Sequence, residues 1–187
     1  MKNTAEQFWK MLEPFHPEAE GFCRKLAGSR EDGDDLYQDS LLIALRKHAT
    51  LRDPESFRPW IYRIIVNRHK NRCRQPWWRL AVPLDRVESS VGDDPSKAHA
   101  WKRLLDRALG ALSPEDKALI ILFEVEGWSI AELAELHDKP EGTIKARLSR
   151  ARKKMRKALE KYLPESNAAD KTGERQYALQ RSDTPSE

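Results

Sequence analysis

Basic side chains gather in two segments of the chain, where they could bind the phosphates and base edges of nucleic acid. Residues 63–79 contain no Asp or Glu, and residues 139–157 contain Glu141 as their only acid. Acidic side chains are concentrated elsewhere, notably between residues 31 and 39. Because the formal net charge is only +4, this separation along the chain indicates DNA binding better than the total charge does.

The second basic segment has the spacing of a helix-turn-helix. The sequence predicts a short helix over residues 130–137, a turn over 138–140 and a long helix over 140–163. Apolar residues recur every three or four positions in the long helix and form one buried stripe: Ile144, Leu148, Ala151, Met155 and Leu159. The side chains that point away from this stripe are candidates for contact with DNA bases in the major groove: Lys145, Ala146, Ser149 and Arg150.

The remaining cations of the long helix are expected to contact phosphates; they are Arg147, Arg152, Lys153 and Lys154. The alternative is a solvated basic face on a bundle helix, which is the usual meaning of a charge run. The short capped helix and the tight turn in front of this helix favour DNA binding.

A second candidate DNA surface lies on the helix predicted over residues 53–74. Its expected core stripe is Phe57, Trp60, Ile61, Ile64 and Ile65, whereas Arg63, Asn67, Lys70 and Arg74 lie along another side. Three cations and an amide on one side offer phosphate contacts and one group that can hydrogen-bond a base. The preceding loop, residues 48–56, contains His48, Thr50 and Arg52 and could form a wall of a pocket for an unstacked base.

A third surface, on the helix predicted over residues 32–48, is acidic and includes one leucine. Asp35, Gln38, Asp39 and Leu42 share a side, which would repel DNA and suits a basic protein partner with Leu42 as an apolar anchor. The alternative, a solvated face with Leu42 in the core, is equally compatible with the spacing.

The elements that must position these surfaces are all helical. Further helices are predicted over residues 4–12, 17–26, 98–112 and 113–127, and glycine and strand alternation are scarce. Prolines and a Gly-Asp-Asp-Pro turn signal break the pattern after Gln75. We therefore predict an all-α protein with two small helical domains, residues 1–75 and 98–163, joined by an extended linker over 76–97 and followed by a disordered tail over 164–187.

Several classes of protein are not supported by the composition. No apolar run approaches the roughly 18 residues of a membrane helix, and the N-terminus lacks a secretory signal, so a cytoplasmic protein with reduced Cys23 and Cys73 is expected. His69 and Cys73 lie one helical turn apart, but a structural zinc needs four ligands, so we expect no metal and no cofactor. Neither a phosphate-binding glycine loop nor a nucleophile elbow is present, and we expect no enzyme activity.

Two blocks of sequence resemble a known family. Asp35-Leu36-Tyr37-Gln38-Asp39 and Phe57-Arg58-Pro59-Trp60-Ile61-Tyr62-Arg63-Ile64, with Asn67, resemble region two of the extracytoplasmic-function (ECF, group 4) sigma factors of the sigma-70 family. Leu112-Ser113-Pro114-Glu115, Ile130-Ala131-Glu132-Leu133-Ala134 and the stretch 140–152 resemble region four. The resemblance spans about residues 18–163, with both blocks in the expected order.

The resemblance implies a role for each surface. Asp35, Gln38, Asp39 and Leu42 match the helix that docks on the clamp helices of the polymerase β′ subunit. His48, Thr50, Arg52, Arg63, Asn67, Lys70 and Arg74 match the part that melts the minus-ten element and captures a flipped base. Thr143, Lys145, Ala146, Arg147, Ser149 and Arg150 match the helix that recognises the minus-thirty-five element. The family also implies contact of region four with the β flap and control by an anti-sigma factor.

The competing hypothesis is a stand-alone helix-turn-helix regulator, whose N-terminal half would serve as a sensor or dimerisation domain. The polar side of the helix over residues 53–74 distinguishes the two, because it has no purpose in such a regulator. Tight specific binding to duplex DNA without polymerase would favour the regulator.

Overall fold

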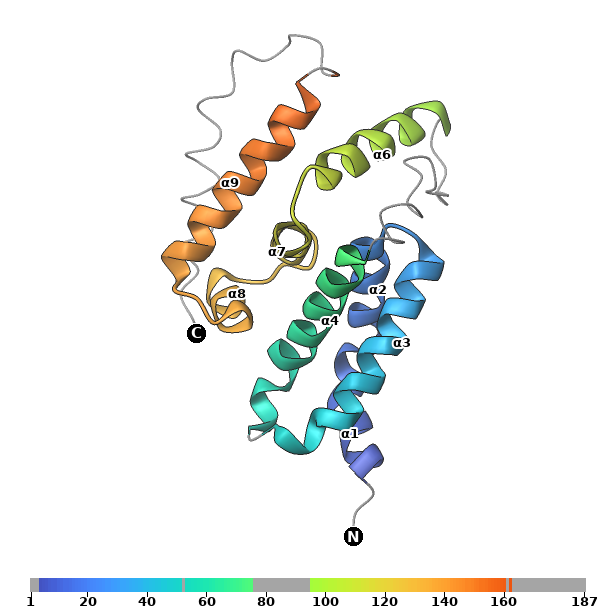
Figure 1. The fold of residues 1–187 in the computed structure, drawn as a ribbon, viewed down its shortest axis with the longest axis vertical. Helices are drawn as coiled ribbons and strands as arrows, with labels where there is room; N and C mark the ends of the chain where they lie inside the picture. The colour runs from blue at the N-terminus through green and yellow to red at the C-terminus, as the bar shows by residue number, and fades with distance from the viewer. Residues whose placement is uncertain (1–3, 52, 76–94, 161, 163–187) are drawn as a thin grey trace.

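The computed structural model describes residues 4–51, 53–75, 95–160 and 162, and every regular element among them is a helix (Figure 1). This confirms the predicted all-α fold class. Within these residues, no helix combines the length and the apolar character needed to cross a lipid bilayer. The predicted tail and most of the predicted linker, residues 76–94, lie outside the described part of the chain.

The N-terminal bundle is formed by four α-helices with short 3₁₀ turns between them. They are α1 (Thr4–Leu12), α2 (His16–Ala27), α3 (Arg30–Lys47) and α4 (Phe57–Arg74), with turns at Glu13–Phe15, His48–Thr50 and Pro54–Ser56. Each helix contributes fully buried apolar side chains, among them Phe8, Phe22, Leu36 and Ile61. Packing of these faces, more than helix propensity, therefore holds the bundle together.

Local signals determine where α2 ends and how closely α3 packs on it. Gly28 has φ 91°, a left-handed conformation that favours glycine, and Ser29 caps α3 by accepting a hydrogen bond from the Asp32 N–H (3.1 Å). A Cβ atom at Gly33 would lie 2.4 Å from the Cα of Arg24. Gly33 thus permits a close approach of the two helices that any larger residue would prevent.

The C-terminal bundle consists of α6 (Pro95–Gly110), α7 (Pro114–Glu124), α8 (Ile130–His137) and α9 (Glu141–Leu159). Helix α9 packs against the other three. Ser129 and Glu132 form a capping box at the start of α8, with hydrogen bonds of 3.2 Å and 2.8 Å. Asp138, at φ 51°, makes the tight turn from α8 into α9.

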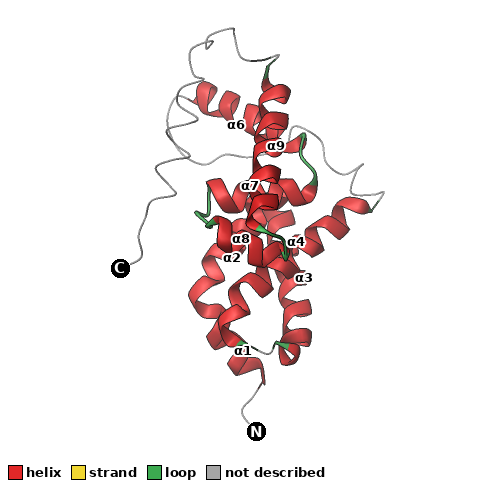
Figure 2. Cartoon of the chain, turned by 90° about the vertical axis from the view of Figure 1, so that its left-hand side faces the viewer, coloured by secondary structure: helices red, strands yellow, loops and turns green. Residues whose placement is uncertain are grey.

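The two bundles contact each other through α7 and α8, which lie beside α4 (Figures 1 and 2). Trp128, in the turn before α8, is buried with its ring centroid 4.8 Å from that of Tyr62 on α4. The guanidinium of Arg58 lies over the same indole at 4.4 Å. We call this arrangement of α7 and α8 on α4 the closed arrangement.

Several predicted helix ends differ from the observed ones. Helix α6 begins at Pro95, inside the predicted linker, because proline is well accommodated in the first turn of a helix. Helix α7 ends at Glu124, and Gly127, at φ 72°, lies in the turn that follows. Helix α9 ends at Leu159 instead of continuing to 163. Each difference reflects fraying or turn chemistry at a helix end, where sequence patterns are weakest.

Candidate polymerase and DNA interfaces

Helix α9 presents the predicted DNA-contacting residues on its solvent side. Ile144, Leu148 and Ala151 are buried against the other helices of the bundle. Thr143, Lys145, Ala146, Ser149 and Arg150 are exposed on the opposite side, and we call this set the α9 face. The helix follows α8 after a tight turn, as the second helix of a helix-turn-helix does. The structure therefore brings together the residues that the sequence assigned to base contacts.

Two predicted phosphate contacts of α9 instead form ion pairs with α7. Arg147 donates to Asp116 Oδ1 (2.9 Å), and Arg152 donates to Glu124 Oε1 (2.6 Å). Partial burial by itself would raise the pKa of Asp116, but hydrogen bonds from Ser113 and Arg147 bring that pKa below its ordinary value. Asp116 is thus charged at neutral pH and holds Arg147 against α7, which fixes the position of α9.

The predicted minus-ten residues of α4 lie on one side of the helix, as expected. We call Arg63, Asn67, Lys70 and Arg74 the α4 strip. Arg63, Asn67 and Lys70 line a pocket of about 330 Å³, whose other walls include Leu136 of α8 and Arg147 of α9. The α4 strip therefore faces the C-terminal bundle over part of its length.

Groups of the C-terminal bundle occupy two cations of the α4 strip. Arg63 donates from Nε to the Leu136 carbonyl (2.7 Å) and from Nη2 to the Glu135 carbonyl (2.6 Å). The Lys70 ammonium lies 2.6 Å from Glu115 of α7. Partial burial would raise the pKa of Glu115, yet its hydrogen bond with Lys70 lowers it below the ordinary value. In the closed arrangement these two cations bind protein oxygens.

The loop before α4 is only partly described. His48 is half-buried, with its ring in edge contact with Phe8 at a centroid distance of 6.0 Å. Thr50 is exposed, and its hydroxyl donates to the Lys47 carbonyl (2.6 Å). Arg52 lies outside the described residues. Asp53 caps the turn before α4 by accepting a hydrogen bond from the Glu55 N–H (3.0 Å).

The acidic surface of α3 is solvent-facing in the structure. Leu42 is 55% exposed, so the alternative that placed it in the core is wrong. Asp35 and Gln38 are exposed and Asp39 is half-buried. We call Asp35, Gln38, Asp39 and Leu42 the α3 face.

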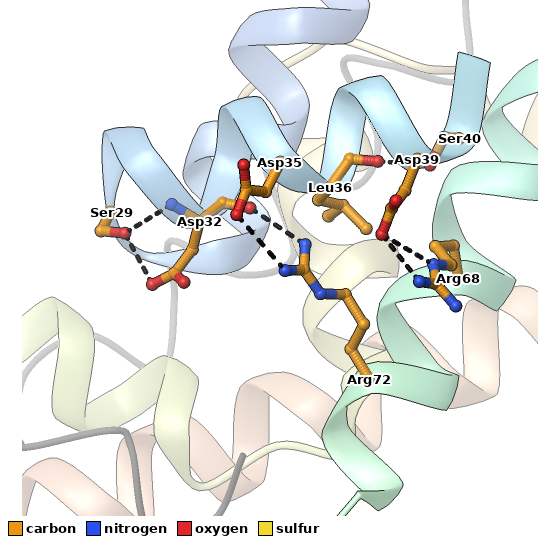
Figure 3. A network of polar contacts seen from close by, with 8 residues as sticks. All are labelled: Ser29, Asp32, Asp35, Leu36, Asp39, Ser40, Arg68 and Arg72. Carbon is orange, nitrogen blue, oxygen red and sulfur yellow. Dashed lines mark hydrogen bonds and ion pairs between the residues drawn. The ribbon is translucent and has the colours of Figure 1, made fainter. Parts of the chain in front are cut away.

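Arginines of α4 orient the two acids of the α3 face, which the sequence did not reveal (Figure 3). Arg68 donates to Asp39 Oδ2 from both Nε (3.1 Å) and Nη2 (2.7 Å). Arg72 lies 3.9 Å from Asp35 and donates to the Asp32 carbonyl (3.3 Å). A paired acid still has lone pairs available for a partner, because each carboxylate can accept several hydrogen bonds.

The buried side of α4 is wider than predicted. Phe57, Ile61 and Ile65 are buried and Trp60 and Ile64 are half-buried, but the buried residues Tyr62, Val66 and His69 had not been assigned to the core. Helix α4 is enclosed by α2 and α3 as well as by α7 and α8, so two of its sides are covered. Burial lowers the pKa of His69 to about 4, with Lys117 and Arg72 acting in the same direction.

Sequence comparisons identify both bundles. The pattern of Sigma-70 region 2 matches residues 11–79, and that of Sigma-70, region 4 matches residues 102–155. The ECF RNA polymerase sigma factor SigM of Mycobacterium tuberculosis is 30% identical over 152 residues, which cover 81% of this chain and 76% of the relative. The ECF RNA polymerase sigma-E factor of Haemophilus influenzae is 32% identical over 137 residues, covering 66% and 72%.

Solved structures show the same fold. The sigma factor RpoE of Bartonella quintana, determined in complex with the anti-sigma factor NepR, superposes with a TM-score of 0.60 at 25% identity, covering 82% of this chain and 97% of that chain. CnrH, determined in complex with the cytosolic domain of CnrY, has a TM-score of 0.61 at 21% identity, covering 87% and 92%.

These observations define a class of helical protein in which an N-terminal four-helix bundle is followed in the chain by a bundle that contains a helix-turn-helix. The chain belongs to the ECF RNA polymerase sigma factors, which are transcription initiation factors of the sigma-70 type. The predicted family and function are confirmed at this level. Because the match includes both regions, the stand-alone regulator is set aside.

Proposed function

We propose that this sigma factor binds core RNA polymerase through the α3 face and directs it to promoters through the α4 strip and the α9 face. Initiation chemistry belongs to the polymerase, and the factor itself catalyses nothing and needs no metal or cofactor. Its place of action is the cytoplasm, where the bacterial chromosome and polymerase are found. The proposal rests on one observation: the exposed α9 face and the exposed α3 face carry opposite charges on different bundles.

Two lines of support assign the α3 face to the β′ clamp helices: the resemblance to region two and the chemistry of the face itself. Leu42 is exposed beside Asp39, so an apolar anchor is framed by negative charge. Such a surface attracts a basic partner, and burial of the leucine in the interface contributes affinity. We assign Gln38 to hydrogen bonding at the same contact.

The α9 face fits the major groove of the minus-thirty-five element. Lys145 and Arg150 can bind guanine edges or phosphates, and Thr143, Ala146 and Ser149 are small enough to let the helix approach the bases. Arg147 acts chiefly as a positioning residue for α9, because its guanidinium already pairs with Asp116. The rest of the C-terminal bundle would rest on the β flap.

The α4 strip, together with His48, Thr50 and Arg52, fits the melted minus-ten element. Arg63, Lys70 and Arg74 supply phosphate contacts along single-stranded DNA, and Asn67 supplies a group that can donate to and accept from a base. We propose the domain limits 1–75 and 98–163 for the two DNA-binding units, with a linker over 76–97 and a tail over 164–187. An anti-sigma factor would hold the protein inactive by covering polymerase-binding surfaces.

Run-off transcription with purified core polymerase on fragmented genomic DNA tests the proposal. Addition of the factor should create start sites that the core enzyme alone does not use; if no new start site is found, the proposal fails. The double variant Asp35→Lys/Asp39→Lys should lower transcript yield by at least about a hundredfold, because charge reversal at an interface costs several kcal/mol.

Glu6→Lys/Glu13→Lys provides the matched control, since it makes the same change of charge at exposed positions outside the α3 face. This control should transcribe normally, and circular dichroism should show both double variants folded. Co-purification of the Asp35→Lys/Asp39→Lys variant with core polymerase at the wild-type level would contradict the assignment of the α3 face.

A further inference from the structure

Helix α4 holds the two acids of the α3 face in different ways (Figure 3). Asp39 accepts two hydrogen bonds from Arg68 at its Oδ2 atom, one from Nε at 3.1 Å and one from Nη2 at 2.7 Å. The Asp35 carboxylate lies farther from its arginine, with 3.9 Å between Oδ2 and Arg72 Nη2, and its side chain is 63% exposed. The carboxylate of Asp39 is therefore fixed in one orientation, whereas that of Asp35 keeps more freedom.

The contact with Arg68 leaves Asp39 able to bind a partner. Both donors of Arg68 reach Oδ2, and Oδ1 accepts no hydrogen bond from any residue that the structure describes. An ionised carboxylate has about four lone-pair sites, so it can accept further hydrogen bonds. The Asp39 side chain is 38% exposed, which lets a partner reach Oδ1 from solvent.

Arg68 has two opposite effects on the binding of a basic partner. Its positive charge partly neutralises Asp39, which weakens the long-range attraction to a cation. Its two hydrogen bonds restrict the rotamers of Asp39, so this side chain loses less freedom when the partner binds. An ion pair as exposed as this one contributes little to folding stability. The main effect of the pair is therefore expected on binding.

We propose that Arg68 is a positioning residue for the polymerase contact: it holds the Asp39 carboxylate in the orientation that core RNA polymerase binds. In this role Arg68 acts through Asp39 and makes no contact of its own with polymerase. The inference rests on the proposed function, because it takes the α3 face as the polymerase-binding surface. It adds a residue of α4, outside both the α3 face and the α4 strip, to the determinants of polymerase binding.

A double-mutant cycle on polymerase affinity tests the proposal. Biolayer interferometry with immobilised core polymerase gives Kd and both rate constants for four full-length proteins: the wild type, Arg68→Ala, Asp39→Asn and the double variant. Asp39→Asn should weaken binding at least about tenfold, because it removes the charge and keeps the shape of the side chain. Arg68→Ala should weaken binding about threefold to tenfold, which corresponds to the cost of ordering one side chain.

The two substitutions should not be additive. In the Asp39→Asn background, Arg68→Ala should change Kd by about twofold or less, because the carboxylate that Arg68 positions is already gone. The loss caused by Arg68→Ala in the wild-type background should appear as faster dissociation. Its association rate should be unchanged or higher, since removal of a cation from an acidic face favours the approach of a basic partner.

Arg24→Ala is the matched control. Arg24 of α2 pairs with Asp34 of α3 at 2.6 Å, so it also joins an arginine of a neighbouring helix to an acid of α3, but Asp34 lies outside the α3 face. Arg24→Ala should bind core polymerase with the wild-type affinity. Urea unfolding should show that all five proteins are folded under the conditions of the binding experiment.

Three results would overturn the inference. They are wild-type or tighter binding by Arg68→Ala, an equal loss from Arg68→Ala with and without Asp39→Asn, and an equal loss from Arg24→Ala. The second result would make Arg68 a direct contact, and the third would attribute the loss to the packing of α3.

The response to Asp39→Asn separates this inference from the proposed function. If Asp39→Asn weakens binding and Arg68→Ala does not, the positioning role fails and the α3 face stands. If neither Asp39→Asn nor Asp35→Lys/Asp39→Lys weakens binding, the assignment of the α3 face fails and the inference fails with it.

Discussion

The α9 face and the α4 strip are both basic surfaces on single helices, but they differ in whether their cations contact other parts of the protein. Lys145 and Arg150 of α9 are exposed, whereas Arg63 and Lys70 of α4 bind oxygens of the other bundle. A helix-turn-helix leaves its second helix on the outside, because the first helix and the core cover only its apolar side. Helix α4 lies at the centre of the contact between bundles and is covered on two sides. Residue types therefore indicate what a surface can bind, and packing decides when it is accessible.

Arg150 provides the first test of the difference between the α9 face and the α4 strip. Arg150→Ala should weaken duplex binding by the holoenzyme about tenfold to a hundredfold at promoters where Arg150 contacts guanine, because Arg150 is exposed on the α9 face. Anisotropy titrations of minus-thirty-five duplexes measure the loss. Lys10→Ala, which removes an exposed cation of α1, serves as the control and should bind normally. Equal duplex affinities of the Arg150→Ala and wild-type holoenzymes would contradict the assignment of Arg150 to base contacts.

The burial of His69 on α4 can be tested through the pH dependence of the free energy of unfolding. Burial holds the pKa of His69 near 4, with Lys117 and Arg72 adding to the effect and Glu115 opposing it. The unfolded chain binds a proton at about pH 6.5, so the folded state loses stability as pH falls from about 6.5 toward 4. At pH 5 the loss attributable to His69 should be about 2 kcal/mol relative to pH 7.

Urea unfolding at pH 7 and pH 5, with the wild type and His69→Gln, measures that contribution. The variant should show a smaller decrease in the free energy of unfolding. His137, whose pKa burial also lowers to about 4, should retain part of the dependence. Equal decreases in both proteins would show that His69 is not held in the buried environment described here.

The smallest expected effect concerns Asn67, which lies on the α4 strip and is exposed toward the pocket. Asn67→Ala should weaken binding of single-stranded minus-ten DNA by the holoenzyme about tenfold, the value of one hydrogen bond to a base. The free factor should show a smaller change, because Arg63 and Lys70 on the same strip bind oxygens of the C-terminal bundle. Fluorescence anisotropy with and without core polymerase measures both affinities. Equal losses of affinity in the free factor and in the holoenzyme would contradict the prediction.

Most of the helices and the family of this protein could be predicted from the sequence alone. Apolar positions that recur every three or four residues and capping residues such as Ser113 and Ser129 predicted nearly every helix, because these signals act within one or two turns of the chain. The motifs that resemble regions two and four predicted the family, and the exposed sides of α3 and α9 carry the residues expected there.

Only the tertiary structure decided which of these side chains are accessible. Burial of Tyr62 and His69, the pairing of Arg68 with Asp39 and of Arg147 with Asp116, and the contact of Arg63 with α8 join segments far apart in the chain. Periodicity describes one helix at a time and does not say which other helices cover it. Trp128 illustrates the difference: the sequence shows an aromatic residue beside a turn, and the fold makes it the buried contact between two bundles.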